Sequence, residues 1–309
     1  MQKLDESAKG VYVITVTPFT DSGALDLEST DRVIDFYLEK GADGLTVLGV
    51  MGEAPKLSAA ESLQYVKRVL DRVKSRIPTI VGVSSPGFAA MKELAAGVMD
   101  LGAAGVMVGP ASTVKTDDQA YGYYEMVAET LGPSTPFCVQ DHPLAYGVQL
   151  PVPVLLKIFK NLPTAVMLKH EDWPGPGLAK LSAIRAGQSR RISILAGNGG
   201  GLFLPEELSR GADGAMTGFG YPEMMVGVCQ AHAAGNIESA HDLFDAYLPL
   251  ARYEQQSAAG LAVRKYMLHK RGAIGNAAIR KPGLRLGAAD IADIDRLIAR
   301  QERRLRELG

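Results

Sequence analysis

Lys169 and Glu171 are the residues of this sequence whose types and spacing could do covalent chemistry. Lys169 ends the apolar run 164–169 (TAVMLK), where an ammonium group would lose much of its hydration. Loss of hydration lowers the pKa of a lysine and leaves a nucleophilic amine, which can form an iminium with a carbonyl carbon. Because side chains alternate along a strand, Glu171 would point to the same side and could move protons for that iminium. An ion pair between Lys169 and Glu171 explains the same spacing, so the spacing alone leaves both interpretations open.

Two glycine-rich segments could bind a small anion through their backbone. In segment 49–53 (GVMGE) the glycines would let N–H groups converge on a substrate carboxylate, and segment 197–201 (GNGGG) would allow a similar close approach. The second segment lacks the spacing of a dinucleotide-binding motif, because position 202 is a leucine. A plain tight turn is the alternative for each segment. We expect the substrate to contact these segments and the last of the expected strands, at Gly49, Val50, Met51, Gly52, Gly197, Asn198 and Met216.

Other chemistries find little support in the sequence. The five histidines show no metal-ligand spacing, so we expect no catalytic metal. Segment 82–87 (GVSSPG) differs by a proline from the G-x-S-x-G pattern of serine hydrolases. Cys138 and Cys229 are too few for a disulfide framework and are expected to be reduced core thiols. Lys56 and Lys115 lie in loops near the expected site and are weaker candidates for a nucleophilic amine.

A repeating alternation of strand and helix patterns must position these residues. Short β-branched apolar runs alternate with longer amphipathic stretches, and turn residues separate them. Eight such units in roughly 220 residues match the size of a (β/α)₈ barrel, whereas a doubly wound sheet would usually use fewer strands. In a barrel the functional residues lie at the carboxyl ends of the strands. The expected strands are 11–17, 43–48, 79–83, 105–109, 136–140, 164–169, 192–196 and 214–218, and the expected helices lie near 28–40, 58–75, 87–101, 117–131, 152–160, 176–187, 203–210 and 222–233.

The chain is expected to form one barrel with a helical tail. Residues 1–235 would form the barrel, and residues 236–309 would form a C-terminal helical extension packed on it. The phrases EKGADGLTV, DLGAAGVMV and SRGADGAMT repeat a helix end, a glycine and a buried strand, as the loops between helices and parallel strands require. No Ser/Gly/Pro-rich linker separates the two parts. The helices of the tail are expected near 236–256, 259–271 and 289–307.

Composition and charge exclude several classes of partner. Of the 309 residues, 47% are hydrophobic and 22% are charged, as in a globular protein with a well-filled core. The formal net charge of −1 gives no reason to expect nucleic acid or an anionic membrane as a partner. No apolar run of about 18 residues could span a bilayer. Residues 1–10 (MQKLDESAKG) lack the apolar segment of a signal peptide, so we expect a cytoplasmic protein.

The order and spacing of these motifs resemble the dihydrodipicolinate synthase/N-acetylneuraminate lyase family of class I (Schiff-base) aldolases. The likeness covers essentially the whole chain. It rests on an early strand ending in VTPF (16–19), on GVMGEA (49–54) in place of a GTTGES-like loop, on MLKHED (167–172) in place of a GIKE-like strand, and on GNGG (197–200) in place of a GDD-like turn. The resemblance implies a homotetrameric barrel enzyme with a Schiff base on Lys169 and a keto-acid carboxylate site in the loop around Val50, Met51 and Gly52.

Departures from the family pattern bear on the substrate. Where the family has a tyrosine at the end of strand five, in a YNVP-like motif, this sequence has Gln140 in segment 140–143 (QDHP). The arginine that the synthase uses for the carboxylate of an aldehyde partner corresponds to Ala145, and its cross-subunit relay tyrosine corresponds to segment 111–112. A glutamine cannot titrate, so it can only orient groups by hydrogen bonds. This combination resembles the sugar-acid dehydratase branch of the family and argues against synthase activity.

The mechanism that this resemblance implies uses Lys169, Glu171 and Gln140. Lys169 would attack C2 of a 2-keto-3-deoxy sugar acid such as L-2-keto-3-deoxyarabonate, which would become α-ketoglutarate semialdehyde. Glu171 would remove a C3 proton and help expel the C4 hydroxyl, and Gln140 would orient that hydroxyl or the attacking water. The lysine itself is the electron sink, so no cofactor is expected. Three alternatives stay open: retro-aldol cleavage to pyruvate and an aldehyde, deamination of a hydroxypyrroline carboxylate, and a catalytically silent barrel that binds a keto acid.

Overall fold

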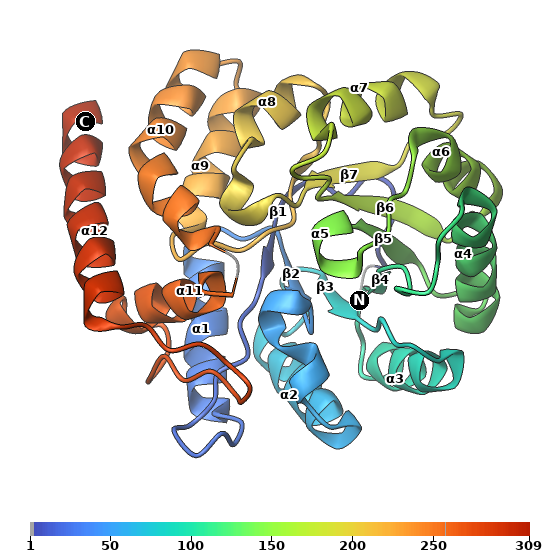
Figure 1. Cartoon of the computed structure of the whole chain (residues 1–309), viewed down its shortest axis with the longest axis horizontal. Helices are drawn as coiled ribbons and strands as arrows, with labels where there is room; N and C mark the ends of the chain where they lie inside the picture. The colour runs from blue at the N-terminus through green and yellow to red at the C-terminus, as the bar shows by residue number, and fades with distance from the viewer. Residues whose placement is uncertain (1–2, 257) are drawn as a thin grey trace.

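Eight parallel strands close into a barrel in which every strand pairs with its neighbours in the chain and β8 pairs with β1 (Figure 1). The computed structural model describes residues 3–256 and 258–309. The closed sheet confirms the predicted (β/α)₈ barrel and excludes a doubly wound sheet. The strands are β1 (Gly10–Ile14), β2 (Gly44–Val47), β3 (Thr79–Gly82), β4 (Gly105–Val108), β5 (Phe137–Asp141), β6 (Ala165–His170), β7 (Ser193–Ala196) and β8 (Gly214–Ala215).

The first and last strands are shorter than predicted. Strand β1 ends at Ile14 and β8 ends at Ala215, each three residues before the expected boundary. Hydrogen bonding between the two segments continues past these ends, since the N–H of Ile14 donates to the carbonyl of Thr217 at 2.9 Å. The apolar runs therefore predict how far the chain stays extended and buried. The part with regular strand geometry is shorter.

A ring of helices follows the strands, largely within the predicted ranges. The helices around the barrel are α1 (Leu27–Glu39), α2 (Ala59–Val73), α3 (Phe88–Asp100), α4 (Asp117–Leu131), α6 (Val152–Asn161), α7 (Gly177–Gly187), α8 (Leu204–Ser209) and α9 (Pro222–Ala233). Short turns that the sequence did not predict occupy the loops after β2, β5 and β7. They are η1 (Val50–Gly52), η2 (Ala54–Lys56), α5 (Pro143–Tyr146) and η3 (Gly199–Gly201). Both glycine-rich segments are therefore wound into 3₁₀ turns.

Capping residues explain where helices begin above the barrel mouth. The Oγ of Ser58 accepts a hydrogen bond from the N–H of Glu61 at 3.2 Å, while Glu61 Oε2 accepts from the N–H of Ser58 at 2.9 Å. This capping box satisfies two backbone donors at the start of α2. Thr116 and Gln119 form the same arrangement at the start of α4. The caps fix the ends of the loops that follow β2 and β4.

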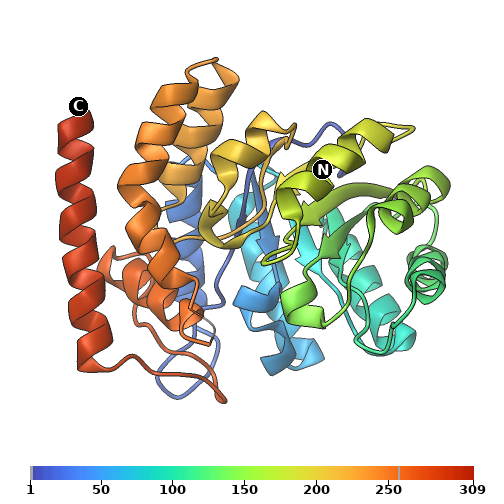
Figure 2. The same cartoon turned by 45° about the horizontal axis from the view of Figure 1, so that its top comes forward.

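Three further helices form the C-terminal tail: α10 (Ile237–Glu254), α11 (Gly260–Lys270) and α12 (Ala288–Leu308). Helix α10 packs against α9, and α12 packs against α10, so that the tail lies on one side of the barrel (Figures 1 and 2). The segment after α11 returns to the barrel, where the N–H of Gly275 donates to Ser29 Oγ at 2.8 Å. Among the residues that the structure describes, no helix has the length and apolar character needed to cross a membrane.

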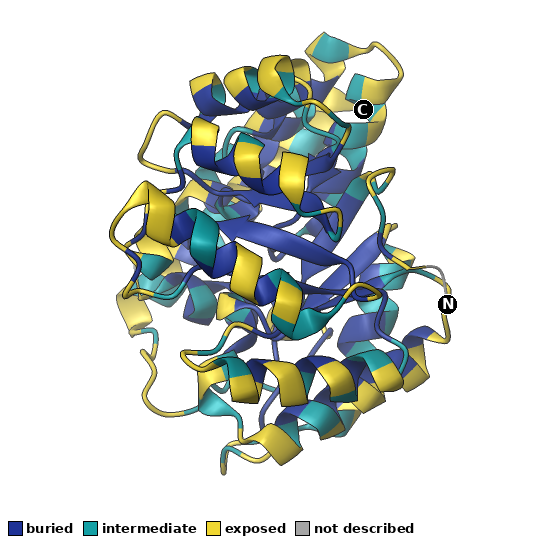
Figure 3. Ribbon diagram, turned by 90° about the vertical axis from the view of Figure 1, so that its right-hand side faces the viewer, coloured by how far each residue is buried: buried dark blue, intermediate teal, exposed yellow. Residues whose placement is uncertain are grey.

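Apolar side chains fill both sides of the barrel sheet. The outward side chains pack beneath helices whose outer faces are exposed (Figure 3). Cys138 is buried, Cys229 is half-buried and neither forms a disulfide, as predicted. The cluster inside the barrel consists of Leu4, Tyr12, Ile14, Ile80, Met107, Cys138, Val166, Met167, Leu195 and Met216.

One step beyond this inner cluster, the inward positions of the strands change character. Side chains on the same face recur every second residue, so the next inward positions lie two residues closer to the carboxyl ends. After Ile80, Met107, Leu195, Cys138 and Met167, these positions are three glycines and two polar residues: Gly82, Gly109, Gly197, Gln140 and Lys169. The glycines allow the backbone of Leu48 and the side chains of Tyr146 and Glu171 to come close to the ends of the strands.

Candidate active site

Lys169 lies near the end of β6, at the mouth of the barrel. The strand register pairs it with Gln140 on β5 and with Leu195 on β7. Lys169 and Gln140 are both buried, with exposed fractions of 4% and 1%. A buried ammonium is costly unless an opposite charge or hydrogen-bond acceptors lie beside it. The chain supplies such a partner two residues further on.

Glu171 is that partner. Its Oε2 lies 3.0 Å from Lys169 Nζ and accepts a hydrogen bond from Gln140 Nε2 at 2.8 Å. The N–H of Glu171 donates to the carbonyl of Asp141 at 2.8 Å, which holds the backbone where the chain leaves the strand. The structure therefore brings Lys169, Glu171 and Gln140 together around one carboxylate oxygen. The contact is an ion pair that is also short enough for proton exchange between the two side chains.

Gly197 leaves the space that the Glu171 side chain occupies. A β-carbon on Gly197 would lie 2.2 Å from Glu171 Cγ and 3.0 Å from Lys169 Cγ. The N–H of Gly197 donates to the carbonyl of His170 at 2.7 Å, so this backbone is fixed against β6. The first glycine of the GNGGG segment is therefore required by the packing of the site itself.

Tyr146 and His142 also reach this group, and sequence reasoning missed both. Tyr146 Oη donates to Gln140 Oε1 at 2.9 Å, and burial, with the charge of Glu171, raises the pKa of Tyr146 to about 12. His142 Nδ1 lies 3.6 Å from Glu171 Oε2, and burial lowers the pKa of His142, so the ring is neutral at pH 7. The signal was a proline at the first helical position with a glycine at the end, in PLAYG, which predicts a helical turn directly after β5.

The loop after β2 offers two backbone donors. The N–H groups of Gly52 and Glu53 are used within the loop, by the carbonyls of Gly49 and Val50. Within residues 3–256 and 258–309, the N–H groups of Val50 and Met51 donate to no protein acceptor. The side chain of Met51 packs against the cluster inside the barrel. The loop can therefore present two adjacent N–H groups to a carboxylate.

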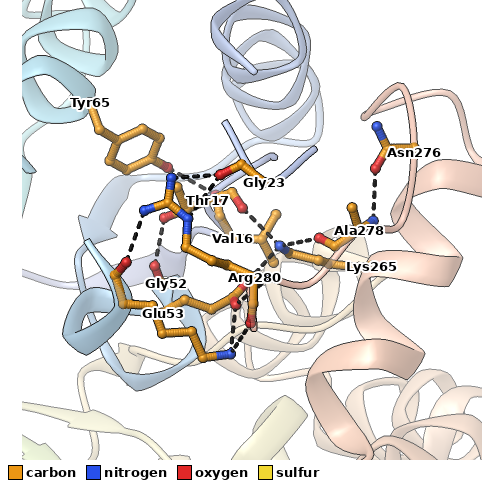
Figure 4. Close-up of polar contacts among 11 residues, drawn as sticks. Val16, Thr17, Gly23, Gly52, Glu53, Tyr65, Lys265, Asn276, Ala278 and Arg280 are labelled. Atoms are coloured by element: carbon orange, nitrogen blue, oxygen red, sulfur yellow. Dashed lines mark hydrogen bonds and ion pairs between the residues drawn. The ribbon is translucent and has the colours of Figure 1, made fainter. Parts of the chain in front are cut away.

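The C-terminal tail holds this loop through Glu53 (Figure 4). Glu53 is buried with a left-handed backbone (φ 57°), and its carboxylate lies 2.6 Å from Lys265 Nζ and 2.8 Å from Lys56 Nζ. The N–H of Arg280 donates to the same carboxylate at 3.1 Å. Lys265 Nζ also donates to the carbonyls of Thr17 and Ala278, both at 2.8 Å. Glu53 and Lys265 together therefore join the loop to the segment after β1, to α11 and to the segment before α12.

A cavity of about 1020 Å³ opens from this loop across the ends of β3, β4 and β5. Gly49, Val50 and Gln140 line it, and Tyr146 and Ala145 form its wall beside β5. Lys56 also lines the cavity, although Glu53 neutralises it. The other weaker candidate, Lys115, is exposed and donates to the carbonyl of Ser112 at 2.7 Å.

Five of the residues expected to touch substrate lie outside the cavity lining, as do Lys169 and Glu171, which reach it through Gln140. The five are Met51, Gly52, Gly197, Asn198 and Met216. Asn198 Nδ2 donates to Glu207 Oε1 at 3.1 Å on α8, and both side chains are buried. Met216 is fully buried in the cluster inside the barrel, below the level of Lys169. Burial raises the pKa of Glu207 to about 7, so this carboxyl is largely protonated below neutral pH. Asn198 therefore supports α8 in this structure.

A second buried group of ionisable side chains lies on the outer side of β6. Lys180 Nζ lies 2.6 Å from Asp141 Oδ2 and 3.2 Å from Asp172 Oδ2. His170 Nδ1 lies 3.4 Å from Asp141 Oδ2, and its Nε2 lies 2.8 Å from the carbonyl of Gly177. His170 therefore points away from Lys169, as the alternation of side chains requires.

A (β/α)₈ barrel with a buried lysine, a carboxylate and an amide at the carboxyl ends of its strands has the architecture of a barrel enzyme. The chain belongs to the dihydrodipicolinate synthetase family, whose sequence profile matches residues 7–300. The family consists of lyases, and membership places this chain among them.

Relatives within the family bear two kinds of name. An L-2-keto-3-deoxyarabonate dehydratase of Azospirillum brasilense is 30% identical over 280 residues, which cover 89% of this chain and 88% of the relative. A 4-hydroxy-tetrahydrodipicolinate synthase of Persephonella marina is 27% identical over 245 residues, which cover 78% and 81%. The crystal structure of a dihydrodipicolinate synthase from Rhodopseudomonas palustris matches with a TM-score of 0.93 and 48% identity, over 97% of this chain and 100% of that one.

Proposed function

We propose that this protein dehydrates a 2-keto-3-deoxy sugar acid, L-2-keto-3-deoxyarabonate, to α-ketoglutarate semialdehyde. The observation that carries the proposal is the convergence of Lys169 and Gln140 on one oxygen of Glu171 beside the cavity. The dehydratase of Azospirillum brasilense, similar over most of both chains, supports the same substrate.

The proposed reaction begins at C2 of the substrate. Lys169 Nζ adds to the C2 carbonyl, and loss of water leaves a protonated iminium. Glu171 removes one proton from C3, and the electrons of that C–H bond pass into the iminium to give an enamine. The enamine then expels the C4 hydroxyl, which leaves as water with the proton that Glu171 carries. Hydrolysis releases Lys169, and a shift of the remaining double bond toward C5 converts the C5 alcohol into the aldehyde.

The substrate carboxylate is assigned to the loop after β2. The N–H groups of Val50 and Met51 are adjacent donors, and Val50 lines the cavity. Glu53 and its partners in the tail hold the backbone that carries them. A carboxylate bound there would lie across the barrel mouth from β6, so that the neighbouring keto carbon is presented to Lys169. Gln140 then has the role of holding Glu171 in place.

Synthase activity is the second candidate, because the Rhodopseudomonas palustris relative at 48% identity bears that name. Such a reaction joins a keto acid to an aldehyde that carries its own carboxylate. Among the described residues that line the cavity, Lys56 is the one lysine or arginine, and Glu53 already pairs with it. Ala145 stands where the resemblance leads us to expect an arginine. These features favour the loss of a hydroxyl over the addition of a carboxylated aldehyde.

Borohydride trapping followed by mass spectrometry tests the shared first step. The native protein is incubated with L-2-keto-3-deoxyarabonate and reduced, and the modified residue is identified by peptide mapping. We expect the adduct on Lys169, no adduct in Lys169→Met, and an unchanged adduct in Lys115→Met, whose lysine is exposed. An adduct that persists in Lys169→Met would contradict the assignment.

Product analysis then separates the reactions that share this adduct. Dehydration gives α-ketoglutarate semialdehyde, retro-aldol cleavage gives pyruvate and a short aldehyde, and deamination of a hydroxypyrroline carboxylate releases ammonia. Synthase activity would consume pyruvate and an added aldehyde. Formation of pyruvate in place of the semialdehyde would transfer the assignment to the retro-aldolase. A barrel that only binds the keto acid would form neither product.

We also propose that the protein assembles as a homotetramer, which the family resemblance implies. Light scattering or sedimentation of the full chain at micromolar concentration is expected to give four times the chain mass of 32.9 kDa. A stable species of another size would contradict this assembly.

A further inference from the structure

Tyr146 and Gln140 form a hydrogen-bonded pair on the wall of the cavity. Tyr146 Oη donates to Gln140 Oε1 at 2.9 Å, while Gln140 Nε2 donates to Glu171 Oε2 at 2.8 Å. An ionised carboxylate only accepts hydrogen bonds, so the amide must turn its NH₂ group to Glu171 and its oxygen to Tyr146. The phenol hydrogen is therefore committed to Gln140. The Ser84 hydroxyl is also a hydrogen-bond partner of Tyr146 and opposes the rise in its pKa. A phenol oxygen has two lone pairs, so one is left to accept a hydrogen bond from another group.

The local fold holds the tyrosine over Gln140. Pro143 begins the short helix α5, and Gly147 ends it with a left-handed backbone (φ 67°). The ring of Tyr146 occupies the space beyond the end of β4, where a β-carbon on Gly109 would lie 2.2 Å from Tyr146 Cζ. A side chain on Gly109 would displace the ring. The hydrogen bond to Gln140 on β5 and the absence of a side chain at Gly109 thus fix the position of the Tyr146 hydroxyl.

The carbon chain of a ligand bound covalently to Lys169 would pass beside the Tyr146 hydroxyl. With its carboxylate at the N–H groups of residues 50–51, the carbons beyond C2 must extend into the cavity, whose wall beside β5 is formed by Gln140, Ala145 and Tyr146. Ala145 offers only a methyl group, and both ends of the Gln140 amide are already engaged. Tyr146 Oη, whose hydrogen is donated to Gln140, has a lone pair on this wall for a substrate hydroxyl beside its contact with Ser84.

We propose that Tyr146 binds the C4 hydroxyl of the substrate and thereby selects keto acids that carry this hydroxyl over those that lack it. The proposal rests on the proposed Schiff base at Lys169. The phenol is neutral at pH 7, since burial raises the pKa of Tyr146 to about 12. By accepting the hydrogen of the C4 hydroxyl, it fixes the direction of the C4–O bond while Glu171 acts at C3.

Two ligands that differ only in the C4 hydroxyl test this role: 4-hydroxy-2-oxobutanoate and 2-oxobutanoate. Each is titrated against the full-length protein, reduced with borohydride, and the fraction modified on Lys169 is measured by mass spectrometry. In the native protein we expect half-maximal trapping of the hydroxylated ligand at a concentration about tenfold lower. In Tyr146→Phe we expect this ratio to approach one, while trapping of 2-oxobutanoate stays at its native concentration. That second result also shows that the variant is folded.

Tyr121→Phe is the matched control. Tyr121 lies on the same barrel side in α4, and its hydroxyl accepts from Asn161 Nδ2 at 3.2 Å, outside the cavity lining. The ratio between the two ligands is expected to be native in this variant. A native ratio in Tyr146→Phe would overturn the role of Tyr146 and leave the Schiff base intact. An equal loss of both ligands would also overturn it, because Tyr146 would then support Lys169 generally. If the native protein traps neither ligand, the proposed function fails and this proposal fails with it.

Discussion

Glu171 Oε2 gathers the hydrogen bonds that define the site, so the charge of this one carboxylate matters most at the scale of single residues. Glu171→Gln keeps the size of the side chain and removes its ability to take a proton from C3. We expect turnover to fall by on the order of 10²–10⁴-fold, because that is the usual contribution of a general base. Borohydride trapping on Lys169 should persist. Steady-state kinetics and intact mass measure the two effects.

Glu129→Gln is a control for the change from glutamate to glutamine, since Glu129 is exposed on α4. Its turnover is expected to be native. Unchanged turnover in Glu171→Gln would remove Glu171 from the mechanism, and the contact with Lys169 would then be only the ion pair that the spacing also allowed.

Gly197 gives a second test at this scale. A β-carbon there would lie 2.2 Å from Glu171 Cγ, so Gly197→Ala must displace the carboxylate from Lys169. Turnover is expected to fall at least tenfold with the fold retained, because the error is local and catalytic groups need close alignment. Gly122→Ala in α4 meets no atom within 4 Å and is expected to keep native turnover. Steady-state kinetics measure the turnover, and circular dichroism checks that the fold is retained. Native turnover in Gly197→Ala would show that the position of the Glu171 carboxylate is unimportant.

At the scale of elements, α11 and the segment after it support the loop after β2. Lys265→Met leaves the buried Glu53 without its closest partner, and removal of one partner of a buried ion pair costs about 3–5 kcal/mol of stability. We also expect a higher KM for the keto acid, since the loop carries the proposed carboxylate donors. Denaturant unfolding and kinetics measure the two effects.

Lys67→Met is the control for this substitution, because it removes a lysine from an ion pair on the surface. Lys67 pairs with Asp71 at 2.7 Å, and both side chains are more than half exposed. Exposed pairs contribute roughly 0–1 kcal/mol, so this variant should unfold close to the native midpoint. If Lys265→Met lost no more stability than Lys67→Met, the contact between Lys265 and Glu53 would not stabilise the loop after β2.

At the scale of the whole molecule, stability should depend on pH through Glu207. Burial raises the pKa of Glu207 from 4.5 to about 7, and the charge of Glu206 adds to this, while His170 and the hydrogen bond from Asn198 oppose it. The folded state therefore binds a proton that the unfolded chain releases. This contribution is fully present below pH 4.5 and is lost as pH rises through 7, a change of roughly 3 kcal/mol.

Glu207→Gln removes this dependence, because the amide resembles the protonated carboxyl at every pH. We expect the variant and the native protein to be similarly stable at pH 5. At pH 8 the variant should be more stable by up to roughly 3 kcal/mol. Unfolding curves at the two pH values supply the comparison. Parallel curves for both proteins would mean that Glu207 titrates alike in the folded and unfolded states.

The sequence predicted the barrel and the proposed catalytic group because both depend on local periodicity. Eight apolar runs with turn residues between them determine a closed parallel sheet, and alternation along β6 places Lys169 and Glu171 on one side. Contacts between distant segments were not predictable in this way. The position of the Tyr146 ring depends on Gly109, 37 residues earlier, where a side chain would displace the ring.

The same limit applies to the residues that the structure placed elsewhere. Asn198 was expected to face the substrate, but its partner Glu207 lies on the next helix and attracts its amide. Glu53 lies in a predicted glycine loop, yet its partner Lys265 comes 212 residues later. Side-chain pairing across such separations depends on how helices dock, and hydrophobic periodicity carries no information about it.

The dependence of Glu53 on Lys265 and Arg280 also bears on how the protein is synthesised. A nascent polypeptide that ends after β8 already contains Lys169, Glu171 and Gln140, but lacks Lys265 and the backbone N–H of Arg280, two of the groups that bind Glu53. Ribosomal products that end before α11 would therefore combine a nearly complete barrel with a Glu53 carboxylate that has lost Lys265 and keeps Lys56 as a charged partner. We expect the loop after β2 to be less ordered in such fragments, and the fragments to be cleaved by proteases more readily than the full-length chain.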